Sequence, residues 1–453
     1  MALSRDRGFY RQAARLTGFI ALQNVIVCFV GLADNVMIGA FSQDALSGVA
    51  LANQLQFLLQ MLIGGVGEGM AVIAAQYWGA RSLQPIRRVT AIALELAVAL
   101  GAVFFALAQL CPEAMLGLLA ADRAAIGEGA AYLRIVSFSY VFFSASLVLV
   151  SAQRSVENVR AGMWSSVCGL MVNIALNWAL IFGRLGAPRM GARGAALATL
   201  IARAAEFAVA AACTYGADRK LAVPLADFVR PGGALLRDFC RVAFPVILSG
   251  GSWGVAQAVQ TGILGHLGSA AIAANAIANS LFQVVSVVAF GMASASAVLI
   301  GKAVGSGERE RLRGYVNSLQ LIYLGIGVVS GLALYLLRGW VLSLYAVTPE
   351  AFGLADRFMA VLSVTIVGTA YQCSCLTGIV RGGGNTRFVF YNDLIFMWGI
   401  VLPASILAAF VWRWSPLYVF ICLKSDQVVK CLVAAWEVNS YRWVRMVVRE
   451  GEA

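Results

Sequence analysis

The feature that most limits the fold of this chain is a series of apolar runs, 18 or more residues long, that recurs along its whole length. A run of that length lets a helix cross the roughly 30 Å hydrocarbon layer of a bilayer. Because lipid offers no partners to backbone amides, each crossing has to be helical, and the alternation typical of barrel strands is absent. Only 12% of the residues are charged and 60% are hydrophobic, which indicates a polytopic membrane protein.

The hydropathy pattern predicts an all-α fold with twelve transmembrane helices. They are 16–39, 46–77, 88–110, 131–152, 162–182, 192–214, 238–265, 272–302, 315–345, 357–380, 388–411 and 416–438. An even number of crossings puts both termini on one side, and most of the arginines between the apolar runs lie on that side. The positive-inside rule therefore predicts cytoplasmic termini and a multi-pass protein of the inner cell membrane. Arg184, Arg189 and Arg193, in one outer loop, count against this orientation without overturning it.

The net charge of +12 does not indicate nucleic-acid binding, because the basic residues lie between apolar runs, where they set topology. The chain has one histidine, His266, and no phosphate-binding loop, so neither an enzyme nor direct use of ATP is expected. We expect no organic cofactor and no firm metal site. The expected partners are the lipid bilayer and a small-molecule substrate, and the expected state is a monomer.

The sequence contains an internal repeat. Residues 15–79 align without a gap with 241–305, and twelve identities exceed the roughly five expected by chance for this composition. A second match, offset by 227 residues, pairs Arg154 and Arg160 with Arg381 and Arg387. With six crossings in each half, the repeat is parallel. It predicts two pseudo-symmetric six-helix bundles around a central cleft, 1–214 and 237–453, joined by a cytoplasmic linker over 215–236.

Several short motifs follow one another along the predicted helices. They are Asp34-Asn-Val-Met-Ile-Gly39, Ala75-Gln-Tyr-Trp-Gly79, Asn173-Ile-Ala-Leu-Asn177, Gly378-Ile-Val-Arg381-Gly-Gly-Gly-Asn-Thr386 and Tyr441-Arg-Trp443. In this order, and over nearly the whole chain, they resemble the MATE (multidrug and toxic compound extrusion) family. The resemblance implies an antiporter that exports amphipathic, cationic drugs or metabolites in exchange for H⁺ or Na⁺ by alternating access.

Asp34 is the acid that most needs a reason. It follows an uncharged stretch from Leu16 to Ala33, and a carboxylate at mid-helix costs about 2.5–3.5 kcal/mol on insertion scales. Its repeat partner is Gln260, so the two halves differ in charge at matching depth. Desolvation favours the neutral form of a carboxyl group and lets it bind and release a proton near neutral pH. The alternative is a structural acid bonded to neighbouring hydroxyls or amides.

The resemblance also implies a cation-coupling site at Asp34. Asn173, Asn177 and Thr199 match the positions that surround this acid in some members of the family. Asn177 stands where those members carry an acid, which removes one negative charge, favours H⁺ and leaves Na⁺ at Asp34 as the other option. The family's second coupling route uses acids in the first and fourth helices of the C-terminal half, and neutral residues occupy those stretches here.

Other charged residues leave alternatives open. Glu68 is either a second titratable group facing the cleft or the partner of an Arg or Asn at a helix interface. The spacing of Arg203 with Glu206, and of Asp426 with Lys430, predicts ion pairs along one helix face. Asp393, near Arg387, is expected to be structural, and Glu95 has no assigned role.

A cavity between the halves would be lined by helices one, two, seven, eight and ten. The candidate wall residues are Gln56, Phe57, Gln257, Gln260, Gln283, Tyr371 and Gln372, and helix packing is the alternative for each of them. A flippase for a lipid-linked precursor is the rival function. It needs several basic residues facing the cavity to hold pyrophosphate, and the predicted spans contain few, Arg203 being the main case. A non-transporting scaffold is a third, weaker alternative.

Overall fold

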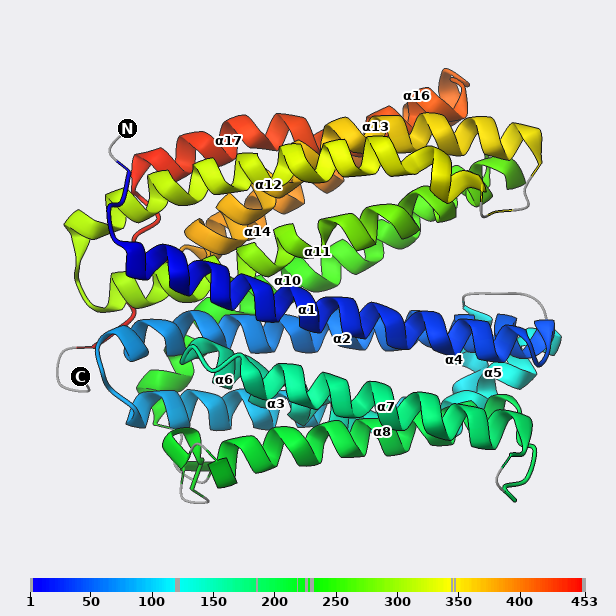
Figure 1. Ribbon diagram of the computed structural model, residues 1–453, viewed down its shortest axis with the longest axis horizontal. Helices are drawn as coiled ribbons and strands as arrows, with labels where there is room; N and C mark the ends of the chain where they lie inside the picture. The colour runs from blue at the N-terminus through cyan, green and yellow to red at the C-terminus, as the bar shows by residue number, and fades with distance from the viewer. Residues whose placement is uncertain are drawn as a thin grey trace.

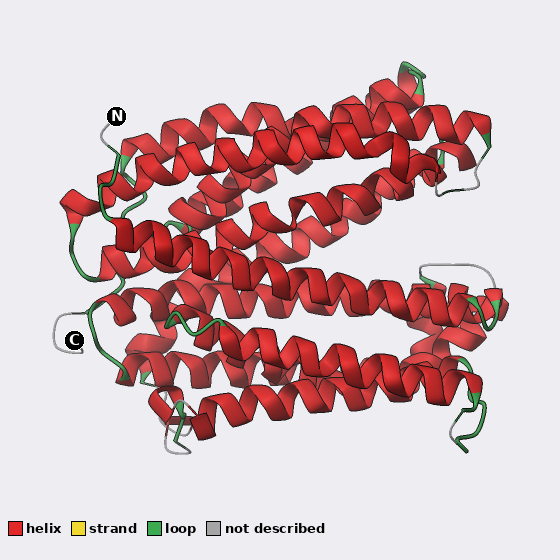
Figure 2. Cartoon of the chain, in the orientation of Figure 1, coloured by secondary structure: helices red, strands yellow, loops and turns green. Residues whose placement is uncertain are grey.

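The computed structural model describes residues 3–118, 123–184, 186–217, 219–224, 227–228, 232–343, 345 and 348–449. Within these ranges the secondary structure is helical and contains no strand (Figure 2). The all-α prediction is therefore confirmed. Part of the predicted linker over 215–236 lies outside the described residues, so its role stays a prediction.

Ten helical segments of the described chain are long and apolar enough to cross a membrane. They are α1 (Arg7–Gly39), α2 (Gln43–Gly79), α3 (Gln84–Leu110), α7 (Arg160–Phe182), α8 (Ala192–Ala212), α10 (Gly233–Gly265), α11 (Ser269–Gly305), α12 (Arg309–Ser343), α13 (Pro349–Cys373) continuing as η3 (Ser374–Val380), and α14 (Thr386–Leu394) continuing through η4 (Ile395–Val401) and α15 (Leu402–Ile406) to η5 (Leu407–Val411). Each coincides with a predicted span.

The two remaining predicted spans are each built from two helices. The fourth consists of α5 (Arg123–Val136) and α6 (Ser139–Ser155), which meet at a bend of 58°. The twelfth consists of α16 (Pro416–Lys424) and α17 (Asp426–Ser440), with only Ser425 between them. The short elements α4 (Pro112–Gly117), η1 (Cys213–Ala217) and η2 (Arg219–Leu221) complete the described helices. The protein is a multi-pass membrane protein.

Two helix groups lie side by side along the membrane-crossing direction (Figure 1). The first half comprises α1 to α8 and the second comprises α10 to α17, and both chain termini lie at one end of the molecule, here called the terminal end. Away from that end the ribbons of the two halves diverge. The hydrogen bonds and ion pairs that join the halves lie towards the terminal end, among them Thr17 to Met292, Lys302 to Glu157 and Gln76 to Arg445.

The repeat predicted from the sequence appears as matched helix crossings between the halves. Gly79 lies directly against the carbonyl of Lys302, and Gly305 lies in the same way against the carbonyl of Gln76. Both partners of one contact are 226 residues from the corresponding partners of the other. A side chain at either glycine would overlap backbone atoms, so α2 and α11 can approach this closely only through glycine.

A third contact locates the pseudo-two-fold axis. Ala75 and Gly301 are themselves 226 residues apart, and a Cβ at Gly301 would lie 2.8 Å from the Cβ of Ala75. A contact between two repeat-related positions has to lie on the axis that relates the halves. The axis therefore runs between α2 and α11 near the terminal end, as expected for a parallel repeat.

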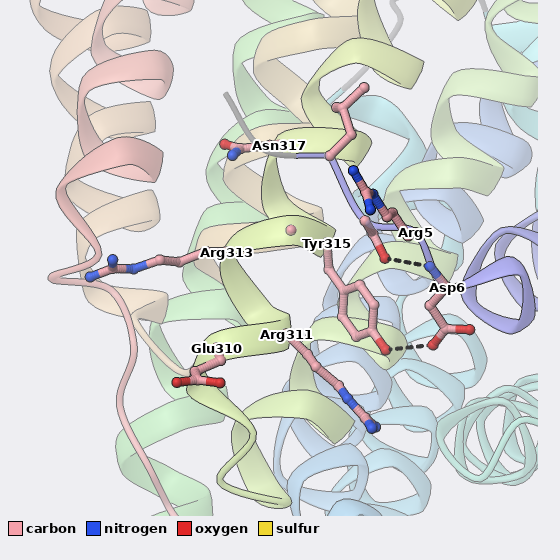
Figure 3. Close-up of a pocket in the computed structure, with 10 residues that line it drawn as sticks. Arg5, Asp6, Glu310, Arg311, Arg313, Tyr315 and Asn317 are labelled. Atoms are coloured by element: carbon pink, nitrogen blue, oxygen red, sulfur yellow. Dashed lines mark hydrogen bonds between the residues drawn. The ribbon is translucent and has the colours of Figure 1, made fainter.

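The beginning of α1 joins the two halves at the terminal end (Figure 3). The Asp6 carboxylate caps α1 by accepting from the amide of Gly8 at 2.8 Å, and it also accepts a hydrogen bond from the Tyr315 hydroxyl at 3.0 Å. That hydrogen bond from Tyr315 holds the pKa of the Asp6 carboxyl below its usual range. The ring of Phe9 stacks on that of Tyr315 at 4.1 Å between centroids. These contacts explain why α1 begins at Arg7, nine residues before the predicted span.

Candidate functional site

The structure brings Asp34, Asn173 and Asn177 together inside the first half. Asp34 lies near the end of α1, and Asn173 and Asn177 lie one turn apart on the same face of α7. The amide nitrogen of Asn177 donates to Oδ1 of Asp34 and also to Oδ1 of Asn173, the latter at 3.1 Å. Both asparagines are buried, and Asp34 is partly buried.

Several polar atoms around this carboxylate have no partner. Oδ1 of Asn177, Nδ2 of Asn173 and Oγ1 of Thr199 are buried and make no hydrogen bond in the described structure. Tyr132, a buried residue of α5, lies close to both Asp34 and Thr199. Leaving a buried polar atom unpaired costs about 1–3 kcal/mol. Unpaired oxygens beside a carboxylate are the surroundings that a small cation would complete.

An ion pair lies next to this site. Nη1 of Arg203 is 2.7 Å from Oε2 of Glu206 on α8, as the i, i+3 spacing predicted. Arg203 is also close enough to Asp34 for the two charges to interact. Gly169 of α7 leaves the room that Glu206 occupies, since a Cβ there would overlap its carboxylate. With one arginine and two acids, the cluster has one net negative charge and can be neutralised by a single cation.

The second half has no acid at the repeat-related position. Gln260 is buried in α10, and its amide lies 3.4 Å from the sulfur of Met397. The acids of the second half lie elsewhere: Lys430 binds Asp393 at 3.2 Å and Asp426 at 3.4 Å. The Asp426–Lys430 pair was predicted. Asp393, expected to be structural beside Arg387, is instead held by Lys430 and by the hydroxyl of Ser249 at 2.9 Å.

The predicted cavity residues divide into two groups. Gln372 is buried and bonded to Gln427, and Tyr371 donates to Gln320, so both serve contacts within the second half. Phe57 and Gln283 are exposed, whereas Gln56 and Gln257 are half-buried. The Phe57 ring lies 6.1 Å from that of Trp253 across the two halves.

Glu68 meets an arginine of the other half. Its Oε2 accepts a hydrogen bond from Nη1 of Arg381, so α2 and η3 are joined by an ion pair that links the halves. Of the two readings of Glu68, the structure has the interface partner. Arg154 of α6 lies beside this pair in a small pocket. The expectation of few cavity-facing arginines was wrong here, because the predicted fourth and tenth spans end at 152 and 380, just before Arg154 and Arg381.

The comparisons with known proteins agree with this architecture. The family model MatE matches residues 20–179 and 245–423. The probable multidrug resistance protein NorM of Thermotoga maritima is 24% identical over 428 residues, covering 94% of this chain and 91% of the relative. The multidrug resistance protein PmpM of Pseudomonas aeruginosa is 25% identical over 406 residues, covering 88% and 84%.

Solved structures show the same fold. A crystal structure of MATE in the straight conformation superposes with a TM-score of 0.85 at 20% identity, covering 95% of this chain and 96% of that chain. The outward-facing conformation of a multidrug resistance MATE family transporter of the MOP superfamily also gives 0.85 at 20% identity, covering 97% and 99%. Since the family model matches most of both halves, this chain belongs to the MATE family of membrane transporters.

Proposed function

We propose that this protein exports amphipathic, cationic small molecules from the cytoplasm in exchange for H⁺, which binds to Asp34. The observation that carries the proposal is a partly buried carboxylate held by two asparagines, with unpaired amide and hydroxyl groups beside it and no ion-pair partner in the described structure. The names of NorM and PmpM support drug efflux as the transported process. Na⁺ is the alternative coupling ion.

Helix α1 connects the coupling site to the interface between the halves. Asp34 lies near one end of α1, and further along the same helix Thr17 donates to the sulfur of Met292 on α11 at 2.9 Å. A Cβ at Gly291 of α11 would lie 3.1 Å from the amide nitrogen of Ala21. A shift of α1 on protonation of Asp34 would therefore be felt where the halves meet. With cytoplasmic termini, the present arrangement is closed towards the cytoplasm and suits proton uptake from outside.

A single coupling ion is sufficient for export. At a membrane potential of about 100 mV, one inward charge supplies roughly 2.3 kcal/mol. At about 1.4 kcal/mol per tenfold, this sustains a substrate gradient of roughly fifty-fold. One titrating carboxylate therefore meets the energetic requirement.

In proteoliposomes, we expect an imposed pH gradient to drive dye transport without Na⁺. The physical reason is that the Asp34 cluster has one net negative charge and places an arginine near the carboxylate, which disfavours a hydrated metal ion more than a proton. Transport of a cationic dye is followed by fluorescence, with choline replacing Na⁺. Transport that occurs only with a Na⁺ gradient would reverse the choice of ion.

Asn177→Asp should change the ion preference. It adds a second carboxylate beside Asp34, and two carboxylates with the oxygens of Asn173 and Thr199 form an all-oxygen site of the kind that binds hard cations. We expect Na⁺ to stimulate transport by this variant several-fold while wild type stays indifferent. The same proteoliposome assay, at fixed pH gradient and varied Na⁺, measures the difference. Equal Na⁺ responses in the two proteins would contradict the charge argument.

The flippase alternative depends on arginines that face the cavity, and Arg154 and Arg381 meet that description. However, Glu68 already neutralises one of them, and the pocket they line measures only about 40 Å³. A pyrophosphate group with its lipid is far larger than this space. The small pocket favours an exporter.

A further inference from the structure

The pocket around Arg154, Arg381 and Glu68 lies on the pseudo-two-fold axis of the molecule. Its lining residues occur as repeat-related pairs: Glu68 with Ser294, Ala71 with Ala297, Val72 with Val298 and, at an offset of 227, Arg154 with Arg381. The pocket therefore has one wall in each half. Its volume of about 40 Å³ is enough for one ion or water molecule.

The pairing is symmetric in arginine and asymmetric in acid. Each half contributes one guanidinium, but only the first half contributes a carboxylate, since Ser294 stands opposite Glu68. The pocket thus has one net positive charge in a region of low dielectric. An uncompensated charge there is costly unless a counter-ion accompanies it.

The donors of the two arginines are not used up by Glu68. Glu68 binds Nη1 of Arg381, whereas Nε of Arg381 is buried and has no acceptor, and Arg381 as a whole is only 9% exposed. The guanidinium of Arg154 makes no hydrogen bond or ion pair with any described residue, although its charge interacts with Glu68. Buried, unpaired guanidinium donors around an empty space are an acceptor site for an anion.

We propose that Arg154 and Arg381 form a binding subsite for a small monovalent anion between the two halves. The occupant is a carboxylate group of a transported zwitterion or a free halide, which shares Arg381 with Glu68 and neutralises Arg154. Because the ligand would contact one arginine from each half, its binding is tied to how the halves meet. This inference goes beyond cation-coupled export, and its binding test does not depend on transport.

The first experiment measures anion binding to the purified full-length protein by thermal unfolding. Sodium gluconate is replaced stepwise by sodium chloride at constant ionic strength. We expect a saturable rise in the unfolding temperature of wild type and at least about tenfold weaker chloride affinity in Arg154→Gln, because a charge-assisted contact is lost. Arg160→Gln is the matched control, since Arg160 belongs to the same motif but is exposed. Glu68→Gln should bind chloride more tightly than wild type, because it removes the internal competitor.

The second experiment distinguishes the two sources of the anion. Binding of a xanthene dye with a free carboxylate is compared with binding of its methyl ester, for wild type and for the two arginine variants. A preference for the acid that disappears in Arg154→Gln assigns the subsite to the substrate. Equal binding of acid and ester, together with a chloride effect, assigns it to a free anion. The proposal is overturned if wild type shows neither effect, or if Arg154→Gln and Arg160→Gln respond alike.

Discussion

Asp34→Asn is expected to abolish the proton-driven substrate gradient while leaving the protein folded. The amide keeps the shape of the side chain and its hydrogen bonding to Asn177, but it cannot bind a proton at neutral pH. Without a coupled ion, the transporter can only equilibrate its substrate. The gradient should therefore fall from roughly fifty-fold at about 100 mV to about one. Dye extrusion by energised inverted vesicles measures this ratio.

Asp356→Asn is a matched control for this experiment. Asp356 forms an ion pair with Arg338 at 3.3 Å, and 41% of its side chain is exposed. The same chemical change there should cost little, since exposed ion pairs contribute about 0–1 kcal/mol. Both variants should elute as single monodisperse species with similar unfolding temperatures. Unchanged extrusion by the Asp34 variant in a folded protein would remove Asp34 from the mechanism.

Gly305→Ala is expected to prevent the halves from closing at the terminal end. Its Cβ would overlap the backbone carbonyl of Gln76, and backbone cannot move aside as a flexible side chain can. Overpacking of this kind costs about 1–3 kcal/mol, which shifts a two-state equilibrium by roughly five- to 150-fold. We expect efflux to fall by a comparable factor and the unfolding temperature to drop.

The repeat provides an internal replicate and the packing provides a control. Gly79→Ala places a methyl group against the carbonyl of Lys302 in the repeat-related contact, so it should give a loss of similar size. Gly325→Ala in α12 meets nothing within 4 Å and should be neutral or slightly stabilising. Equal activity of the Gly305 and Gly325 variants would show that this crossing is not a closed contact of the working transporter.

The helices were predictable because the bilayer imposes one length scale on them. Most span ends in the structure lie within a few residues of the predicted positions, and α7 even ends at the predicted residue, Phe182. The exceptions have local causes. Helix α1 continues to Arg7 because Asp6 caps it and Phe9 packs on Tyr315, contacts to a distant helix that hydropathy does not encode.

The site was predictable only in part. Asn173 and Asn177 share a helix face by their spacing, so their meeting with Asp34 required only that α1 and α7 be neighbours. Tyr132 was missed because it lies on α5, before the bend that turns this helix towards Thr199. Arg154 was missed because a hydropathy span ends at the first charge, whereas α6 continues to Ser155. The 227-residue echo between Arg154 and Arg381 was the signal that could have placed both on the axis.

The lone carboxylate in the first half, opposite an amide in the second, also sets the electrical bookkeeping of the cycle. If Asp34 carries one proton inward per turnover, exchange for a singly charged cation moves no net charge and is indifferent to membrane voltage. A neutral or zwitterionic cargo would instead leave one positive charge moving inward, so its export would generate a current and strengthen as the membrane hyperpolarises.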